Sequence, residues 1–186
     1  MPSLLTVGHG TLDRLALQRL LTEAAVEVLV DVRRYPGSRR NADVRREALE
    51  KWLPAAGIEY RWDERLGGRR HLQSGMAAID MWWTEAAFRA YAAHTRSEEF
   101  ATALADLLAA VPTRQVVIMC SETLWWRCHR RLIADVATLA YRTPVNHLLP
   151  SGSRETHELA AGARLRADGN VVWDGGASQL PIEPDL

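Results

Sequence analysis

Lysine is nearly absent from this sequence: of its 23 basic residues, 22 are arginine, and Lys51 is the exception. A net basic charge is absent as well, because 23 acidic residues bring the formal net charge to zero. A protein that coats nucleic acid would carry a net basic face, so this class is disfavoured. A genome rich in arginine codons would by itself explain the arginine bias, but it says nothing about where the arginines stand.

Many of the arginines occur in adjacent pairs. Guanidinium groups form paired, charge-assisted hydrogen bonds with phosphate and carboxylate groups, so local clusters in a neutral protein suit a site for an anion. The pairs are Arg33–Arg34, Arg39–Arg40, Arg45–Arg46, Arg69–Arg70 and Arg130–Arg131. We therefore expect an anionic small molecule or a nucleic acid as the partner.

Long apolar runs and a cysteine framework are also missing. No stretch approaches the ~20 apolar residues of a membrane span. The N-terminus has no basic segment followed by a long apolar run, so no signal peptide is expected. The two cysteines lie in one short motif, which excludes the disulfide framework of a small secreted domain. The sequence predicts a cytoplasmic protein with no membrane partner, and it assigns neither a cofactor nor an oligomeric state.

What the sequence does have is an alternation of strand-like and helix-like segments. It predicts a single α/β domain over residues 1–186, with a mostly parallel sheet and helices on both faces, a three-layer α/β/α sandwich. Strands are expected at 4–7, 26–32, 58–62, 115–119 and 144–149, the last being the final strand of the sheet. Helices are expected at 12–24, 43–53 (ended by Pro54), 84–95, 98–111 and 129–140. We expect an irregular loop at 63–81, a short helix near 154–161 and a small hairpin around 171–173.

Polar side chains follow several of the predicted strands. His9 follows the first strand, Asp31 and Arg33 end the second, and Cys120 and Glu122 follow the strand at 115–119. His147 lies within the last strand. Ligands of open α/β sheets bind outside the carboxyl ends of the strands, so we expect these groups to share one site there.

The motif MCSETLWWRCHR, residues 119–130, is the densest group of reactive side chains. Cys120 lies where a strand gives way to a loop and a helix, where turn amides and arginines can stabilise a thiolate nucleophile. The alternative is a buried structural cysteine, which is common at strand ends. Phosphatase loops place five residues between cysteine and arginine, but six separate Cys120 from Arg127 and none is glycine. A phosphatase or a rhodanese-like anion loop is therefore disfavoured.

A zinc site is a second interpretation of the same motif. Cys120, Cys128 and His129 could ligate zinc, with Glu122, His9 or His147 completing the set. Seven residues separate the two cysteines, and neighbouring positions 128 and 129 would point about 100° apart on a helix. On this spacing no residue is assigned as a metal ligand. A redox-switching disulfide between the cysteines requires their Cα atoms to lie within about 7 Å.

Most of the remaining candidate site residues could instead have a purely structural role. Glu122 is the preferred general base and Asp31 the second, although Asp31 could equally be an anchor for Arg33 or a loop amide. Gly67–Gly68 predicts a tight turn or a close approach of the backbone to a ligand. Trp125 and Trp126 could pack in the core or stack on a base, and His129 could be a hydrogen-bonded core histidine.

Several segments together resemble the DUF488 family in order and spacing. They are TVGHG, VLVDVRRYPGSRRN, GIEYRW, LGGRR, FRAYAAHTRSEEFATALADL and VVIMCSETLWWRCHRRLIAD, a family-like core at about 4–150 with a C-terminal extension at 151–186. The family's Cys-Ala-Glu, five residues, Cys-His-Arg hallmark reads here Cys120-Ser121-Glu122 and then Cys128-His129-Arg130. The family's Gly-His-Ser is Gly8-His9-Gly10, so any role of that serine hydroxyl is absent or supplied elsewhere.

The resemblance implies an α/β sandwich from a bacterium or archaeon and a shared constellation of residues, but no established activity. The constellation is His9, Asp31, Arg33, Pro36, Ser38, Arg39, Gly67, Gly68, Cys120, Glu122, Cys128, His129 and Arg130.

Three functions are weighed. The first is an enzyme acting on a nucleotide or another anionic substrate related to nucleic acid. Its catalytic residues would be Cys120, Glu122, His9 and His129; its substrate-binding residues would be Asp31, Arg33, Ser38, Arg39, Gly67, Gly68, Cys128 and Arg130. The second is a non-catalytic nucleotide or nucleic-acid binding module, and the third is a metal-binding or redox-sensing domain.

Overall fold

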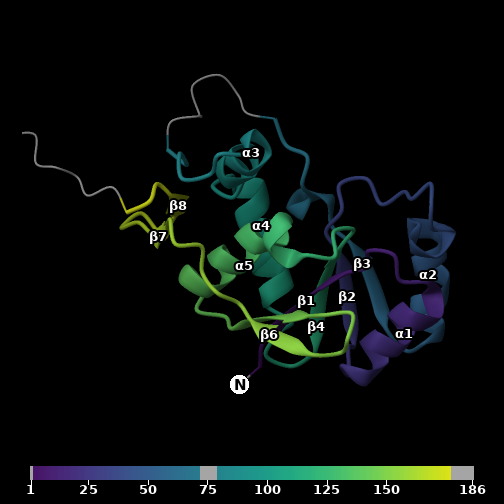
Figure 1. Ribbon diagram of the computed structural model, residues 1–186. Coiled ribbons are helices and arrows are strands. Elements are labelled where there is room, and N and C mark those ends of the chain that lie inside the picture. Colours follow the sequence, from purple (N-terminus) through teal and green to yellow (C-terminus); the bar gives the residue numbers. More distant parts are fainter. Residues whose placement is uncertain (1, 72–78, 177–186) are drawn as a thin grey trace, which may run out of the picture.

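A computed structural model describes residues 2–71 and 79–176 of the chain, arranged around one six-stranded sheet (Figure 1). The strand order is β3-β2-β4-β1-β5-β6, in which the first five strands are parallel and β6 is antiparallel to β5. The strands are β1 (Leu4–Gly8), β2 (Val28–Asp31), β3 (Glu59–Trp62), β4 (Val116–Cys120), β5 (Val145–Leu148) and β6 (Arg154–Thr156). The helices are α1 (Arg14–Glu23), α2 (Arg46–Ala55), α3 (Ala86–His94), α4 (Glu98–Leu108) and α5 (Arg130–Leu139).

Both faces of the sheet are covered, which confirms the predicted α/β sandwich. Helices α1 and α2 pack on one face and α4 and α5 on the other (Figure 1). Successive side chains of a strand point to opposite faces of the sheet. Both faces are covered by apolar side chains here, so all five residues of β4 are buried. Its Val117 and Met119 enter the α1–α2 core, while Val116, Ile118 and Cys120 enter the α4–α5 core. Cys120 is thereby aimed toward the start of α5.

The predicted helix at 43–53 begins and ends later than expected. Residues Ala42–Val44 form a separate 3-10 turn, and α2 runs from Arg46 to Ala55 with Pro54 inside its last turn. Pro54 costs this helix one backbone hydrogen bond, to the carbonyl of Glu50. Glu50 is exposed, so water can satisfy that carbonyl. The expectation that Pro54 ends the helix was wrong.

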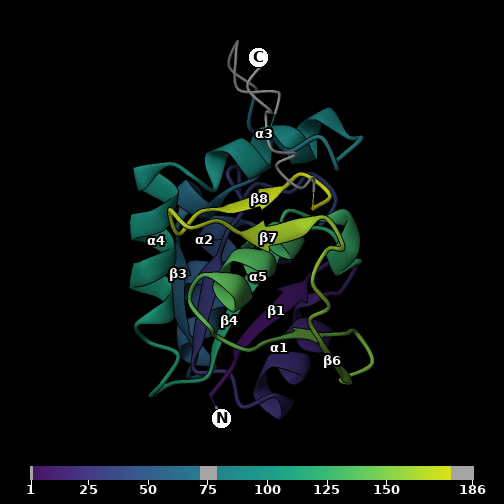
Figure 2. The same cartoon turned by 90° about the vertical axis from the view of Figure 1, so that its left-hand side faces the viewer.

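The tail differs most from the prediction. The expected helix near 154–161 is wrong, because Arg154–Thr156 form strand β6, and β5 is therefore not the last strand of the sheet. A bare β5 would leave a row of unpaired backbone groups at the sheet edge, and β6 covers it. The hairpin around 171–173 is confirmed as β7 (Ala163–Leu165) and β8 (Val171–Trp173). It lies over α5, and Trp173 enters the same core (Figure 2).

The expected loop at 63–81 holds a 3-10 turn at Glu64–Leu66, and its residues 72–78 lie outside the described part of the chain. Among the described residues, no helix has both the length and the apolar character needed to cross a membrane.

Candidate functional site

A cavity of about 1160 Å³ opens at the carboxyl edge of the sheet. Its walls come from the loops that follow β1, β2 and β4, together with the Gly68–Arg69 segment and the start of α3. These segments meet because β2, β4 and β1 are adjacent parallel strands whose carboxyl ends share one edge. Cys120, Cys128 and His129 line this cavity, as do Ser38, Arg39 and Glu122.

The cavity is lined by many more positive than negative side chains. Six arginines face it, namely Arg33, Arg34, Arg39, Arg45, Arg69 and Arg127, against the two carboxylates of Glu85 and Glu122. Across residues 2–71 and 79–176, only Arg33 of these six forms an ion pair. The sequence reasoning named Arg33 and Arg39 but missed Arg34, Arg45, Arg69 and Arg127 as lining residues. Three of these four belong to the adjacent arginine pairs of the sequence, and this pairing is the feature from which they could have been predicted.

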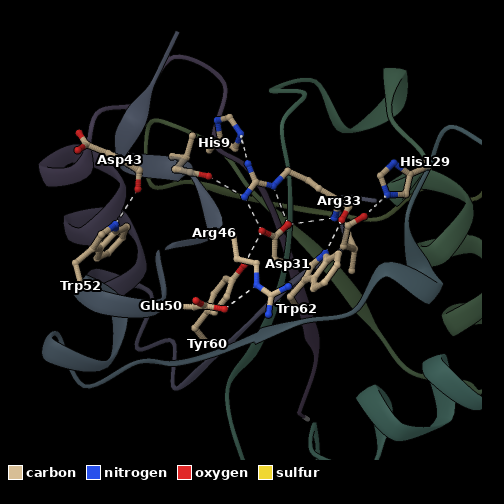
Figure 3. Close-up of polar contacts among 12 residues, drawn as sticks. His9, Asp31, Arg33, Asp43, Arg46, Glu50, Trp52, Tyr60, Trp62 and His129 are labelled. Carbon is tan, nitrogen blue, oxygen red and sulfur yellow. Dashed lines mark hydrogen bonds and ion pairs between the residues drawn. The ribbon is translucent and has the colours of Figure 1, made fainter. Parts of the chain in front are cut away.

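Asp31 and Arg33 form a buried, two-pronged ion pair in which Arg33 lines the cavity and Asp31 does not (Figure 3). Arg33 Nε and Nη2 donate to the two carboxylate oxygens at 2.8 and 2.5 Å, and the Arg33 backbone N–H donates to Asp31 at 3.1 Å. Tyr60 donates its hydroxyl to Asp31 at 2.9 Å, and Arg33 also donates to the Val44 carbonyl at 2.8 Å. Asp31 thus holds both Arg33 and a loop amide, the two anchoring roles foreseen for it.

Burial would lower the pKa of Arg33, but the hydrogen bonds and charge of Asp31 outweigh burial and raise it. Burial, followed by the charge of Asp31, raises the pKa of Tyr60. Arg33 therefore stays charged with its carboxylate partner in place.

His9 lies behind Arg33 and does not line the cavity. Arg33 Nη1 donates to His9 Nε2 at 3.3 Å, so the ring proton sits on Nδ1, which donates to the Gly10 carbonyl at 3.1 Å. Burial and then the charge of Arg33 lower the pKa of His9. His9 is thus a neutral histidine with both ring nitrogens already engaged.

Two sulfurs and an imidazole converge on the floor of the cavity. The Sγ atoms of Cys120 and Cys128 lie 3.8 and 3.5 Å from His129 Nδ1, and the three atoms are all within 4.8 Å of one another. Both cysteines are free and buried. Cys128 is extended (φ −128°, ψ 152°) and His129 caps α5, so the expectation that helical geometry separates their side chains was wrong.

The two thiols lie in opposite electrostatic situations. Burial alone would raise the pKa of Cys128, but the neighbouring Cys120 thiol, the His129 ring and the charge of Arg130 together outweigh burial and lower it. The hydrogen bond to Cys128, followed by burial, raises the pKa of Cys120. Of the two thiols, Cys128 is therefore the one whose surroundings favour the thiolate form, the reverse of the preference that the sequence gave to Cys120.

Arg130 is buried away from the cavity and holds the loop between β4 and α5. Its Nε donates to Cys128 Sγ at 3.4 Å, its Nη1 to Thr6 Oγ1 at 3.3 Å, and its Nη2 to the carbonyls of Glu122 and Thr123. These contacts place Arg130 as a support of the motif rather than as a group facing an anion.

The two glycines are needed for close approach rather than for a left-handed turn. Neither Gly67 nor Gly68 has a positive φ. A Cβ on Gly67 would lie 2.8 Å from the Arg34 backbone, and a Cβ on Gly68 would lie 2.9 Å from His129 Nδ1. Gly68 lines the cavity and Gly67 does not.

The two tryptophans have different surroundings. Trp125 is buried and stacks on His147 with ring centroids 4.0 Å apart. Trp126 is 43% exposed and lines the cavity, as does the exposed ring of Tyr35. Glu122 is exposed at the same cavity, with its Oε1 accepting from the Leu124 amide at 3.3 Å.

His147 belongs to a buried chain that the sequence reasoning did not foresee. Thr6 Oγ1 lies 2.7 Å from His147 Nδ1, His147 Nε2 lies 3.0 Å from His157 Nδ1, and His157 Nε2 lies 2.9 Å from Asp135 Oδ1. Trp173 Nε1 donates to the other carboxylate oxygen of Asp135 at 2.8 Å. The chain ties the sheet to α5 and the tail, and His147 does not line the cavity.

The family model for a domain of unknown function, DUF488, matches residues 12–137, a span that includes both cysteines. The chain belongs to the DUF488 family. Neither the search of curated proteins nor the search of solved structures found a match. The DUF488 match runs from just after His9 to the third turn of α5, within the 4–150 range expected for the family-like core.

Proposed function

We propose that this DUF488 protein is an enzyme that acts on a phosphate-bearing anion, a nucleotide or a nucleic-acid component. The observation that carries the proposal is that one cavity holds both the arginine cluster and the Cys120–Cys128–His129 group. Arginines without carboxylate partners can form charge-assisted, two-pronged hydrogen bonds with phosphate at little cost in broken ion pairs.

The cavity also offers flat apolar surfaces beside its charges. Trp126 and Tyr35 are exposed rings among the arginines. An aromatic ring can stack on any of the nucleobases, because each of them has a flat π-face. The proposed pose has phosphate on the arginines, base on an aromatic face, and the reacting bond near the two sulfurs. Glu122, an exposed carboxylate in the same cavity, is the proposed general base.

The test is a binding and turnover screen of nucleoside mono-, di- and triphosphates and short oligonucleotides, each beside its phosphate-free nucleoside. Binding is followed by tryptophan fluorescence and turnover by chromatography of the products. We expect the phosphorylated ligands to bind, with affinity that falls as salt rises. Arg39→Ala should weaken binding by about 10-fold, as expected for one lost charge-assisted contact, while Arg19→Ala, on the exposed face of α1, should not.

Equal binding of nucleoside and nucleotide would contradict the proposed anion site. Salt-sensitive nucleotide binding with no product from any ligand would favour the binding-module alternative over an enzyme.

A further inference from the structure

We propose that Cys120, Cys128 and His129 form a zinc site whose fourth coordination position opens into the arginine-lined cavity. Zinc bound by two cysteines, one histidine and an exchangeable water is a known catalytic arrangement. Zinc binding goes beyond the proposed function and does not require it, although a metal at this point would supply that function with a Lewis acid.

The distances from His129 Nδ1 to the two sulfurs fit a tetrahedral ion. Zn–S and Zn–N bonds of about 2.3 and 2.0–2.1 Å place neighbouring S and N ligands about 3.6 Å apart. The observed separations from His129 Nδ1 are 3.8 Å to Cys120 Sγ and 3.5 Å to Cys128 Sγ. The two sulfurs lie within 4.8 Å of each other, so the three ligands can close around zinc by side-chain rotation.

The surroundings of His129 prepare its Nδ1 as a ligand. His129 Nε2 lies 3.0 Å from the Val32 carbonyl, which can only accept, so Nε2 carries a ring proton. Zinc takes the neutral ring, and in that form the lone pair of Nδ1 faces the two sulfurs. Histidine ligands of metals usually donate their second N–H to a carbonyl or carboxylate in this way. Val32 directly follows β2, so the orientation of the ring is fixed by the sheet.

Cys128 also has a hydrogen-bond partner that would not itself bind the metal. Arg130 Nε donates to its sulfur at 3.4 Å, an interaction that favours a thiolate. A disulfide between Cys120 and Cys128 would use both sulfurs but leave His129 Nδ1 with no donor among the described residues, because its contacts there are the two sulfurs. A zinc ion satisfies all three atoms at once.

The charge balance also allows a cation in this positive cavity. Two thiolates neutralise Zn²⁺, and the thiol protons displaced on binding pass to solvent. All three ligands line the cavity, so the remaining position faces its open space. A water held there can exchange with an anionic oxygen that the arginines bring to the site.

The test is the zinc content of full-length protein purified without a histidine tag or chelator. We expect about one zinc per chain, as a single tetrahedral site predicts. Cys120→Ser, Cys128→Ser and His129→Asn should each lower the affinity for added Zn²⁺ by more than the ~10–100-fold that loss of an outer partner causes. His71→Ala, an exposed histidine, is the matched control and should bind zinc like wild type.

Co²⁺ replacement covers the case in which a variant fails to fold. Wild-type protein should develop the intense visible bands of a tetrahedral site and the thiolate-to-cobalt charge-transfer band. Wild-type protein without zinc that binds neither Zn²⁺ nor Co²⁺ would overturn the proposal, and so would folded variants that bind zinc like wild type. Wild-type protein that binds no zinc but keeps arginine-dependent nucleotide binding would remove the metal site alone. Retained zinc with no nucleotide binding would remove the proposed function alone.

Discussion

Arg130 donates its Nε hydrogen to the sulfur of Cys128 across 3.4 Å while the rest of its guanidinium holds Thr6 and the loop at Glu122 and Thr123. One buried side chain thus connects strand β1, the loop that contributes Glu122, and the thiol at the floor of the cavity. The residue looks like an anion-binding arginine in the sequence, but its position makes it the support of the site.

Replacing Arg130 should therefore destabilise the fold. Arg130→Gln removes donors from buried carbonyls and from Thr6, and each buried group left unsatisfied costs about 1–3 kcal/mol. We expect the free energy of unfolding, measured in urea, to fall by about 2–5 kcal/mol. Arg19→Gln, an exposed arginine on α1, serves as control and should change it by less than about 0.5 kcal/mol. Equal stability of the two variants would contradict the supporting role.

Asp31 should behave as an anchor and not as a general base. Asp31→Asn leaves Arg33 buried without a counter-charge, and breaking a buried pair in this way costs about 3–5 kcal/mol. Tyr60→Phe removes one hydrogen bond from the same carboxylate and should cost about 1 kcal/mol. Urea unfolding of both variants measures the difference. An Asp31→Asn protein that is as stable as wild type but inactive would instead indicate a catalytic role.

Stability should fall as the solution becomes acidic. Burial first, and then the charges of His157 and Arg130, lower the pKa of His147 to about 3. Between the unfolded value near 6.5 and about 3, the unfolded chain binds a proton that the folded chain excludes. The free energy of unfolding then drops as pH falls, by up to about 1.4 kcal/mol per pH unit for each such histidine.

His147→Asn removes this titration and should flatten the dependence of stability on pH between about 6.5 and 4. The lowered pKa values of His9 and His94 act in the same direction, so some slope should remain. His71→Ala is the exposed control and should keep the wild-type slope. An unchanged slope in His147→Asn would show that His147 is not the main group.

Gly68 should tolerate no side chain. The Cβ of Gly68→Ala would lie 2.9 Å from His129 Nδ1, so either the ring or the loop must move. We expect zinc affinity, measured by competition with a chromophoric chelator, to fall by about 10–100-fold. Gly37→Ala is the matched control, because Gly37 lines the same cavity and its Cβ would meet no atom within 4 Å. Equal affinities would show that His129 can yield without loss.

Periodicity and turn chemistry predicted the parallel sheet, the helices on both faces and the edge at which Cys120 and Glu122 lie, because these follow from local residue patterns. A helix was wrongly predicted at 154–156 because strand β6 forms only by pairing with the open edge of β5. Local residue patterns do not reveal such a tertiary contact. Joint ligation by Cys120, Cys128 and His129 was considered from the sequence but disfavoured, for a similar reason. It depends on Cys128 being extended just before α5, which spacing along the chain does not reveal.

The most direct test of the shared cavity is peptide-level alkylation of Cys120 and Cys128 by iodoacetamide in chelator-treated protein, with and without inorganic pyrophosphate or a nucleoside diphosphate. If anion and sulfurs occupy one cavity, the bound anion should slow alkylation at low salt, and high salt or Arg39→Ala should restore the rate. Alkylation that no concentration of either anion changes would contradict the account.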